Sequence, residues 1–330
     1  MAFLKRGKKK GEEGYGDGRV SISAGDDVLL DEEAMVEQLL VCIEAPDYRP
    51  PTLPAVAVDL MTLSGRADVE IDEVVDLLEQ DSLIAGRILK VVGSAAFTGA
   101  AKITSLRDAT MRLGLNTIRD LVMEIAMNMR VFKSADYADT MNLLRRHATA
   151  TANICRVVGN HTKVEAEFAF LAGLLHDVGI AGTLLALSDN KGKRKSPPDL
   201  IAIWPAVDRV HQRAGELMAG IWELPEDIQI TLSNHHQVIR KGEIHLLSAT
   251  VAIANEVAHS LGVGVIPKEN DSVSEMTEAE RDCVSAHTSV DKSSKATIKH
   301  AIDGLGLDPD TLLTIRKEAK EVLATLPTGT

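Results

Sequence analysis

The stretch Leu171-Ala172-Gly173-Leu174-Leu175-His176-Asp177-Val178-Gly179-Ile180 carries the strongest local signal in the chain. Apolar residues run up to an adjacent histidine and aspartate, and a glycine follows shortly afterwards. Imidazole nitrogen and carboxylate oxygen together suit Zn, Mn or Fe better than Mg or Ca. Adjacent helical side chains point about 100° apart, so both can reach one ion only near a helix end or bend. His176 and Asp177 are therefore candidate metal ligands at such a break, where Gly179 would help the chain to bend.

Further histidines flank this pair at ordered positions. His147 lies upstream on a predicted helix, and His211 follows downstream. The doublet His235-His236 comes next, before an aliphatic helix that carries Asn255. A histidine-aspartate dipeptide alone is a weak signal. A series of potential ligands on separate helices is stronger, because such side chains can converge on one site.

The other five histidines are expected to be structural, hydrogen-bonded residues: His161, His245, His259, His287 and His300. His259 is the strongest exception, because it lies four residues after Asn255 and shares its helix face. The cysteines, Cys42, Cys155 and Cys283, are far apart and form no CxxC pair. The sequence therefore indicates neither a disulfide framework nor a thiolate zinc site.

Apolar residues recur three and four positions apart through most of the chain, a spacing typical of amphipathic helices. The pattern predicts helices near 26–45, 55–64, 70–80, 82–92, 105–113, 116–132, 138–159, 164–176, 199–222, 226–237, 244–261 and 309–326. The proline-rich segment 47–54 is expected to be extended, since each proline disfavours helix at the preceding residue. No convincing strand pattern is present, so the predicted fold class is all-α.

The 330 residues carry 36 basic and 48 acidic side chains, for a net charge of −12. This balance disfavours DNA binding, which needs a surplus of Lys and Arg on one face. The basic N-terminus lacks the apolar segment of a secretory signal. No uninterrupted apolar run reaches the roughly 18 residues of a membrane span. We therefore expect a cytoplasmic protein without a membrane span.

The order of the candidate ligands resembles the HD superfamily of metal-dependent phosphohydrolases, in which they run His, His-Asp, His, His-His and Asp. Other motifs resemble the HDOD branch more narrowly: Leu53-Pro54, Asp81-Ser82-Leu83-Ile84-Ala85, Gly93-Ser94-Ala95, Ile103-Thr104-Ser105-Leu106-Arg107-Asp108-Ala109 with Leu113-Gly114, and Ile221-Trp222-Glu223-Leu224-Pro225. HDOD is the output-domain branch, related to HD-GYP and usually found in bacterial signalling proteins. The resemblance implies an HD-type helical bundle with an N-terminal helical subdomain.

The resemblance also implies a metal site with one or two divalent ions, Fe, Mn or Zn. It assigns seven positions to metal binding: His147, His176, Asp177, His211, His235, His236 and, as a weak ligand, Asn255. Asp177 would bridge one metal, shared with His147 and His176, to a second metal held by the three downstream histidines. Asn255 replaces the superfamily's last carboxylate with a neutral amide, which weakens the first site.

Two further departures concern catalysis. Ile180 occupies the position of a phosphate-binding lysine in the HD-GYP branch, and no GYP segment follows the histidine doublet. Arg107 and the basic loop 191–195 are the substitutes available for that lysine. The sequence favours a non-catalytic or weakly catalytic signalling module that acts through other signalling proteins and could bind a nucleotide. Its catalytic residues are unassigned. The alternative is a metal-dependent phosphohydrolase or phosphodiesterase acting on a nucleotide or cyclic dinucleotide.

The predicted organisation begins with a disordered basic tail, residues 1–25, and an N-terminal helix, residues 26–47. An HDOD-like domain, residues 48–262, follows. It comprises a helical subdomain, 48–133, and an HD-type bundle, 134–262. Residues 263–330 are expected to form a polar insertion, loosely ordered over 264–292, and a C-terminal helical extension.

Overall fold

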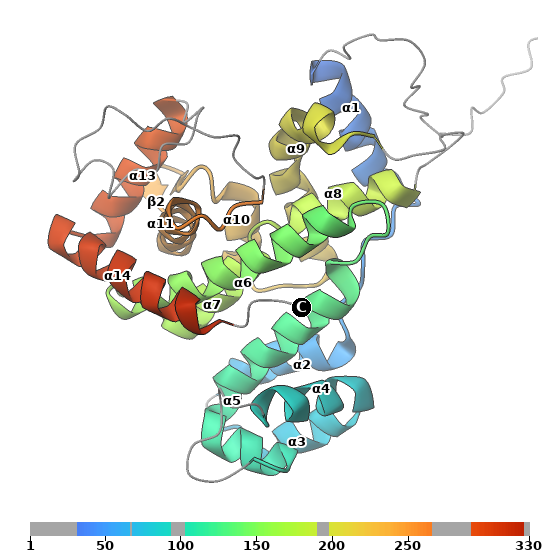
Figure 1. Cartoon of the computed structure of the whole chain (residues 1–330), viewed down its shortest axis with the longest axis vertical. Coiled ribbons are helices and arrows are strands. Elements are labelled where there is room, and N and C mark those ends of the chain that lie inside the picture. Colours follow the sequence, from blue (N-terminus) through green and yellow to red (C-terminus); the bar gives the residue numbers. More distant parts are fainter. Residues whose placement is uncertain (1–31, 67, 94–102, 190–197, 266–291, 327–330) are drawn as a thin grey trace, which may run out of the picture.

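The computed structural model describes residues 32–66, 68–93, 103–189, 198–265 and 292–326. Helices dominate these residues: α1 (Glu32–Ile43), α2 (Ala55–Ser64), α3 (Ile71–Glu79), α4 (Ser82–Val92), α5 (Leu106–Ala126), the π-helix η1 (Met127–Val131), α6 (Ala138–Asn160), α7 (Ala166–Leu175), α8 (Val178–Asp189), α9 (Leu200–Ile221), α10 (Glu226–Asn234), α11 (Leu246–Ser260), α13 (Lys292–Leu305) and α14 (Pro309–Thr325). The all-α prediction is confirmed (Figure 1).

The N-terminal lobe contains α2, α3, α4 and the first part of α5 (Figure 1). Apolar side chains of the amphipathic α3, Val74 and Leu78, are fully buried, as their spacing predicts. α4 begins where Asp81 accepts hydrogen bonds from two backbone N–H groups of its first turn, which is a typical N-cap. Gly114, at φ +78°, kinks α5 between the two helices predicted there.

A buried ionic network joins this lobe to the bundle. Asp120 of α5 accepts hydrogen bonds from the neighbouring Arg119 and, at 2.6 Å, from Arg156 of α6. Arg119 also donates to Ser64 of α2, and Arg156 stacks over the ring of Phe170 in α7 at 4.1 Å. The lobe is therefore tied to the helices that carry the candidate ligands.

The bundle is built around α6, α7, α8 and α9, with α10 and α11 packed beside them. The continuous stretch Phe168–Asp189 is long and apolar enough to cross a membrane by length and composition, but 94% of its most apolar window is buried inside the protein. Such burial is typical of a core helix. The extended segment before α2 crosses the bundle, where Tyr48 donates to the Gly182 carbonyl and Trp222 donates to the Pro51 carbonyl.

Two glycines let the bundle helices approach closely. A Cβ atom at Gly179 would overlap the carbonyl oxygen of His211 and lie 2.6 Å from the backbone nitrogen of Gly215. A Cβ at Gly173 would lie 2.6 Å from the sulfur of Cys155. Gly179 lies in the first turn of α8, directly after the predicted break between two helices. It is needed because α8 and α9 touch backbone to backbone there.

The C-terminal helices cover one side of the bundle. α14 lies along α6, where His161 pairs with Glu318 at 2.9 Å, and α13 packs on α11. At the opposite side, α1 packs on α9, and its Glu33 pairs with Arg209 at 2.7 Å. The bundle is thus enclosed by helices from both ends of the chain (Figure 1).

Three elements differ from the sequence prediction. α8 was not predicted, because its residues are apolar on all sides and show no amphipathic period. α13 also was not predicted. The prediction that the chain contains no strands is wrong at one short hairpin of the described residues, in which β1 (Ile239–Arg240) pairs antiparallel with β2 (Glu243–Ile244). The tail 1–25, the basic loop 191–195 and nearly all of the polar insertion lie outside the described residues. The domain boundaries stay predictions.

Candidate metal centre

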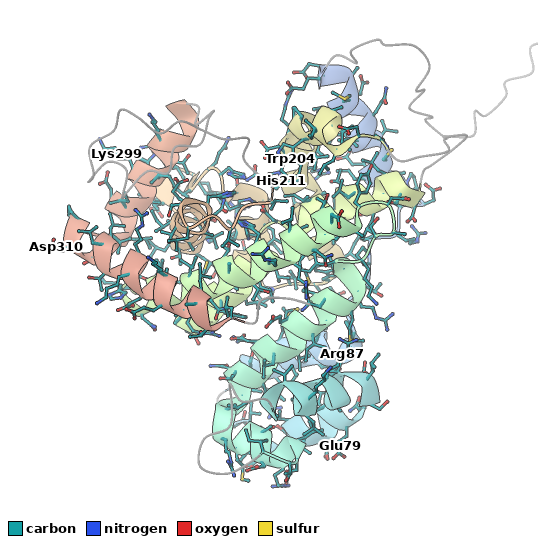
Figure 2. The ribbon with its side chains drawn as sticks, viewed as in Figure 1. Glu79, Arg87, Trp204, His211, Lys299 and Asp310 are labelled. Carbon is teal, nitrogen blue, oxygen red and sulfur yellow. The ribbon has the colours of Figure 1, made fainter. Side chains whose placement is uncertain are left out.

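Six of the seven predicted ligands meet in the bundle interior, from four separate parts of the chain. His147 lies in the middle of α6, and His211, labelled in Figure 2, lies on α9. His176 and Asp177 occupy the two-residue break between α7 and α8, as a shared site requires. His235 and His236 directly follow α10. All of them except His236 are buried.

Potential metal-binding atoms form two triads. The first triad is His147, His176 and Asp177, and the second triad is His211, His235 and His236. Within each triad the candidate atoms lie within 4.8 Å of one another.

The Asp177 carboxylate lies between the triads. Its Oδ2 faces the Nε2 atoms of His147, at 3.4 Å, and His176, at 3.2 Å. Its Oδ1 faces the Nε2 atoms of His211, at 3.7 Å, and His235, at 3.3 Å. Each oxygen therefore serves one pair of histidines, which is the arrangement that a bridging carboxylate needs.

The spacing of the imidazole nitrogens fits metal coordination. The Nε2 atoms of His147 and His176 are 3.3 Å apart, and those of His211 and His235 are 3.2 Å apart. Ligands about 2.1 Å from one ion are separated by about 3.0 Å in octahedral and about 3.4 Å in tetrahedral geometry. The donor set, four imidazoles around one carboxylate, suits Fe, Mn or Zn.

Four of the five histidines are oriented by backbone carbonyls. In the first triad, the Nδ1–H group of His147 donates to the Val263 carbonyl at 2.8 Å, and that of His176 donates to the Gly173 carbonyl at 2.8 Å. In the second triad, His211 donates in the same way to Asp208, and His235 donates to Thr231 at 3.2 Å. A proton on Nδ1 leaves the Nε2 lone pair facing the centre, which is the tautomer that metal-binding histidines use. Facing lone pairs repel one another, so this arrangement favours a cation between them.

The first triad holds a charge pair. Burial by itself raises the pKa of Asp177, but the positive charge of His176 and the hydrogen bond that this imidazolium donates leave that pKa well below its usual value. Burial likewise lowers the pKa of His176, but the charge of Asp177, aided by hydrogen bonds, outweighs it and leaves the pKa raised. Without metal, the first triad therefore favours an imidazolium beside a carboxylate.

The second triad is neutral. Burial lowers the pKa of His211 and of His235 to about 4, and the neighbouring imidazoles add to the effect. Burial also lowers the pKa of His236, and the neighbouring His211 adds to this effect. His236 as a whole residue is exposed, so water moderates this shift. The three imidazoles are therefore uncharged at neutral pH, each with a single ring proton.

Asn255 and His259 flank the first triad on α11. The Oδ1 atom of Asn255 is buried and has no hydrogen-bond partner among the described residues. The ring of His259 lies 5.0 Å from the ring of His147, centre to centre. The helix face that they share is thus turned towards the first triad. The sequence singled out this pair, and the ligand role of Asn255 stays a prediction.

Of the two substitutes for a phosphate-binding lysine, Arg107 lies away from this centre, and the loop 191–195 lies outside the described residues. Ile180 is buried in the core, with 3% of its surface exposed. Arg107 pairs with Asp72 of α3 in the N-terminal lobe. Sequence reasoning missed Val263, whose carbonyl orients His147 from beyond the end of α11, because a backbone carbonyl leaves no signature in the sequence.

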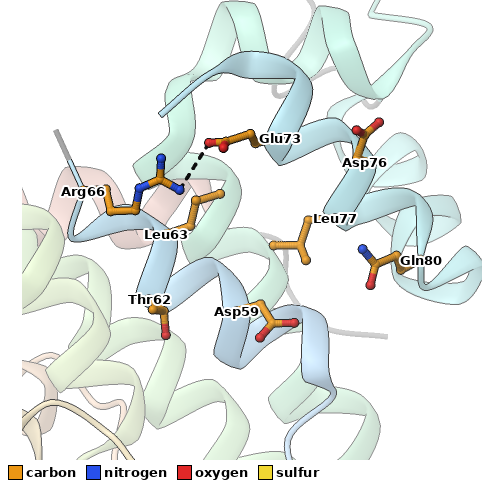
Figure 3. A pocket seen from close by; sticks show the side chains of 8 residues that line it. All are labelled: Asp59, Thr62, Leu63, Arg66, Glu73, Asp76, Leu77 and Gln80. Carbon is orange, nitrogen blue, oxygen red and sulfur yellow. Dashed lines mark ion pairs between the residues drawn. The ribbon is translucent and has the colours of Figure 1, made fainter. Parts of the chain in front are cut away.

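A separate surface cleft of about 310 Å³ lies between α2 and α3 (Figure 3). Charged residues line it, and its Arg66 and Glu73 pair at 3.4 Å while remaining half-exposed. The residues that line it include none of the candidate ligands. The histidine centre carries the convergent buried polar groups, and the cleft does not.

An all-helical bundle with an adjacent His-Asp pair at a helix break, surrounded by histidines from three other segments, defines an HD-type protein. The chain belongs to the HDOD domain family, whose sequence pattern matches residues 51–238. α13 and α14 lie outside that match.

Known proteins support the same fold. An HDOD domain protein of unknown function from Geobacter sulfurreducens is 24% identical, with a TM-score of 0.61 over 90% of this chain and 100% of its own. A Shewanella amazonensis protein provisionally named a metal-dependent phosphohydrolase is 17% identical, with a TM-score of 0.57 over 87% of this chain and 99% of its own. A Marinobacter aquaeolei protein provisionally named a signal transduction protein is 16% identical, with a TM-score of 0.58 over 90% of this chain and 65% of its own.

One sequence relative, an uncharacterized protein from Treponema pallidum, is 27% identical over 215 residues, which is 62% of this chain. The match spans 41% of the length of that relative.

Proposed function

We propose that this chain is a metal-binding HDOD regulatory module of a bacterial signalling system. The two triads would hold two divalent metal ions, with Asp177 shared between them. The observation that carries this assignment is the convergence of four Nε2 atoms on the two carboxylate oxygens of Asp177, at 3.2 to 3.7 Å.

The donor set limits the metal. Nitrogen-rich sites suit Fe, Mn or Zn, whereas Mg and Ca prefer oxygen ligands. A metal bound there would supply positive charge and Lewis acidity in the bundle interior. The protein's own contribution is to hold the imidazoles in the Nδ1–H tautomer and to provide the carboxylate charge.

A regulatory role is favoured over efficient catalysis. Phosphoryl transfer needs positive groups that contact the phosphate. Ile180 is buried and Arg107 lies in the other lobe, so neither supplies such a group. The chain as a whole carries a net charge of −12. We therefore infer that the module acts through contacts with other signalling proteins in the cytoplasm, with a nucleotide as a candidate ligand.

The second candidate function is a metal-dependent phosphohydrolase acting on a nucleotide or cyclic dinucleotide. Two observations favour it. His236 is the exposed member of an otherwise buried cluster. A protein of similar fold also carries a provisional name of that kind.

Metal analysis of the purified protein tests the site. We expect up to two equivalents of Fe, Mn or Zn in the wild type and a reduced content in His176→Ala and His235→Ala. His161→Ala, which removes a histidine outside both triads, is the matched control and should keep the wild-type content. A wild type without metal would overturn the metal assignment.

Assays of phosphodiester hydrolysis with added Mn or Fe separate the two functions. The regulatory role predicts metal binding with no hydrolysis above the level of the His176→Ala variant. Turnover in the wild type that both His176→Ala and His235→Ala abolish would establish the phosphohydrolase instead.

A further inference from the structure

His236 differs from the other four histidines in how it is held. The rings of His147, His176, His211 and His235 are each fixed by a hydrogen bond from Nδ1 to a backbone carbonyl. Within the described residues, the ring of His236 makes contacts with His211 and His235 but no hydrogen bond. Its orientation therefore depends on the backbone that carries it.

That backbone is held by the C-terminal extension. The hydroxyl of Thr297, in α13, donates a hydrogen bond to the carbonyl oxygen of His236 at 3.0 Å. The two residues are 61 positions apart, so this contact exists only in the folded chain. Thr297 also lies beyond residues 51–238, which match the family. The contact thus joins an element outside the matched domain to one of the proposed metal ligands.

α13 is itself firmly seated. Ala301 is completely buried, and Ile298 packs against the core. A Cβ atom at Gly304 would lie 2.6 Å from the side chain of Ile244 in β2, so helix and hairpin touch closely. The position of Thr297 is therefore fixed by the packing of the two helical turns that follow it, and its hydroxyl can transmit that position to His236.

We propose that Thr297 is a positioning residue for His236, and that α13 thereby sets the affinity of the second triad for metal. This rests on the proposed function, because it assumes that the second triad binds metal. Among the described residues, no hydrogen bond joins α13 to the first triad, and His147 is anchored by the carbonyl of Val263 instead. A partner that displaced α13 would therefore weaken one metal site and leave the other intact.

The test uses full-length protein, stripped with a chelator and titrated with Mn²⁺ by calorimetry. Two backgrounds isolate the triads: His147→Ala disables the first, and His211→Ala disables the second. Groups that orient metal ligands typically contribute about 10- to 100-fold in affinity. We expect Thr297→Val to raise the Mn²⁺ dissociation constant about tenfold in the His147→Ala background and to leave it unchanged in the His211→Ala background.

Two further variants control for the loss of a threonine. Thr297→Ser keeps the hydroxyl and should restore the affinity. Thr314→Val removes a comparable hydroxyl-to-carbonyl hydrogen bond within α14, where Thr314 donates to Asp310 at 2.9 Å. It should leave both triads unchanged. Thermal unfolding of the stripped variants checks that each is folded.

Each outcome separates the two proposals. Equal affinities for Thr297→Val and wild type, or equal losses in both backgrounds, would overturn the positioning role while leaving metal binding intact. A wild type that binds no Mn²⁺ and contains no metal as purified would overturn the proposed function, and the positioning role with it.

Discussion

The first and second triads are both built from imidazole groups, but they differ in whether a histidine is positively charged in the absence of metal. The first contains Asp177, and the mutual attraction of carboxylate and imidazole raises the pKa of His176 against the effect of burial. The second has no carboxylate of its own, and burial lowers the pKa of His211 and His235 to about 4. The location of one negative charge therefore decides which triad holds an imidazolium and which holds only neutral imidazoles.

The triads also differ in their exposure and anchoring. The first is enclosed, and His147 is fixed by the carbonyl of Val263. The second ends in His236, which is exposed and held through its backbone. The centre therefore joins a buried triad that contains the Asp177 carboxylate to a more exposed triad that has access to the same carboxylate only through its Oδ1 atom.

The largest expected effect comes from forcing apart α8, which follows Asp177, and α9, which carries His211. Gly179→Ala would force α8 away from α9 at His211. Overpacking of this kind costs about 3 kcal/mol or more, since the obstacle is backbone and not a flexible side chain. Chemical denaturation should show this loss. Gly220→Ala, on α9 with open space around it, is the control and should be close to neutral. A stable Gly179→Ala variant would show that the helices can separate without cost.

Asp177→Asn tests whether one carboxylate serves both triads. We expect metal affinity to fall by more than about 100-fold at both, because the only shared charge is removed while the size of the side chain is kept. Titration with Mn²⁺ in a chelator-stripped sample measures this. Loss at the first triad alone would show that Oδ1 does not bridge.

Acidification should change the contributions of the two triads to the stability of the metal-free protein in opposite directions. His211 has a folded pKa of about 4 against about 6.5 when unfolded, so the unfolded chain binds more protons between these values. Its contribution to stability is complete above about pH 6.5 and is lost as the pH falls towards 4. His176 has a raised folded pKa, so its contribution is present below about pH 6.5 and is lost as the pH rises through the folded value.

Thermal unfolding in chelator between pH 5 and 8 compares two matched variants. His211→Gln should lose less stability than the wild type on acidification, whereas His176→Gln should lose more. Parallel curves for all three proteins would contradict the assigned difference in protonation.

The smallest expected effect concerns Asn255. Asn255→Asp adds a carboxylate where the Oδ1 atom is buried and lacks a partner among the described residues. Added negative charge strengthens cation binding. We expect about tenfold tighter metal binding at the first triad and no change at the second, measured in the His211→Ala and His147→Ala backgrounds. Unchanged affinity at the first triad would show that Asn255 does not face its metal.

Most helices could be predicted because their signals are local. α2 and α4 occupy the predicted ranges 55–64 and 82–92, since prolines, caps and apolar spacing mark their ends. α8 could not be found in this way. A helix buried on every side has no amphipathic period, and the glycine inside it suggested a turn. The hairpin was missed because each of its strands has only two residues.

The sequence by itself determined which residues could form the site, since the order of histidines and the His-Asp pair are properties of the chain. It also determined the departures at Ile180 and Asn255. Only the tertiary structure decided that each oxygen of Asp177 faces one pair of imidazoles and that α8 approaches α9 at Gly179. It also decided the hydrogen bonds that join Val263 to His147 and Thr297 to His236. The reason is physical: these contacts join residues far apart in the chain, and their distances are set by helix packing, which no local pattern encodes.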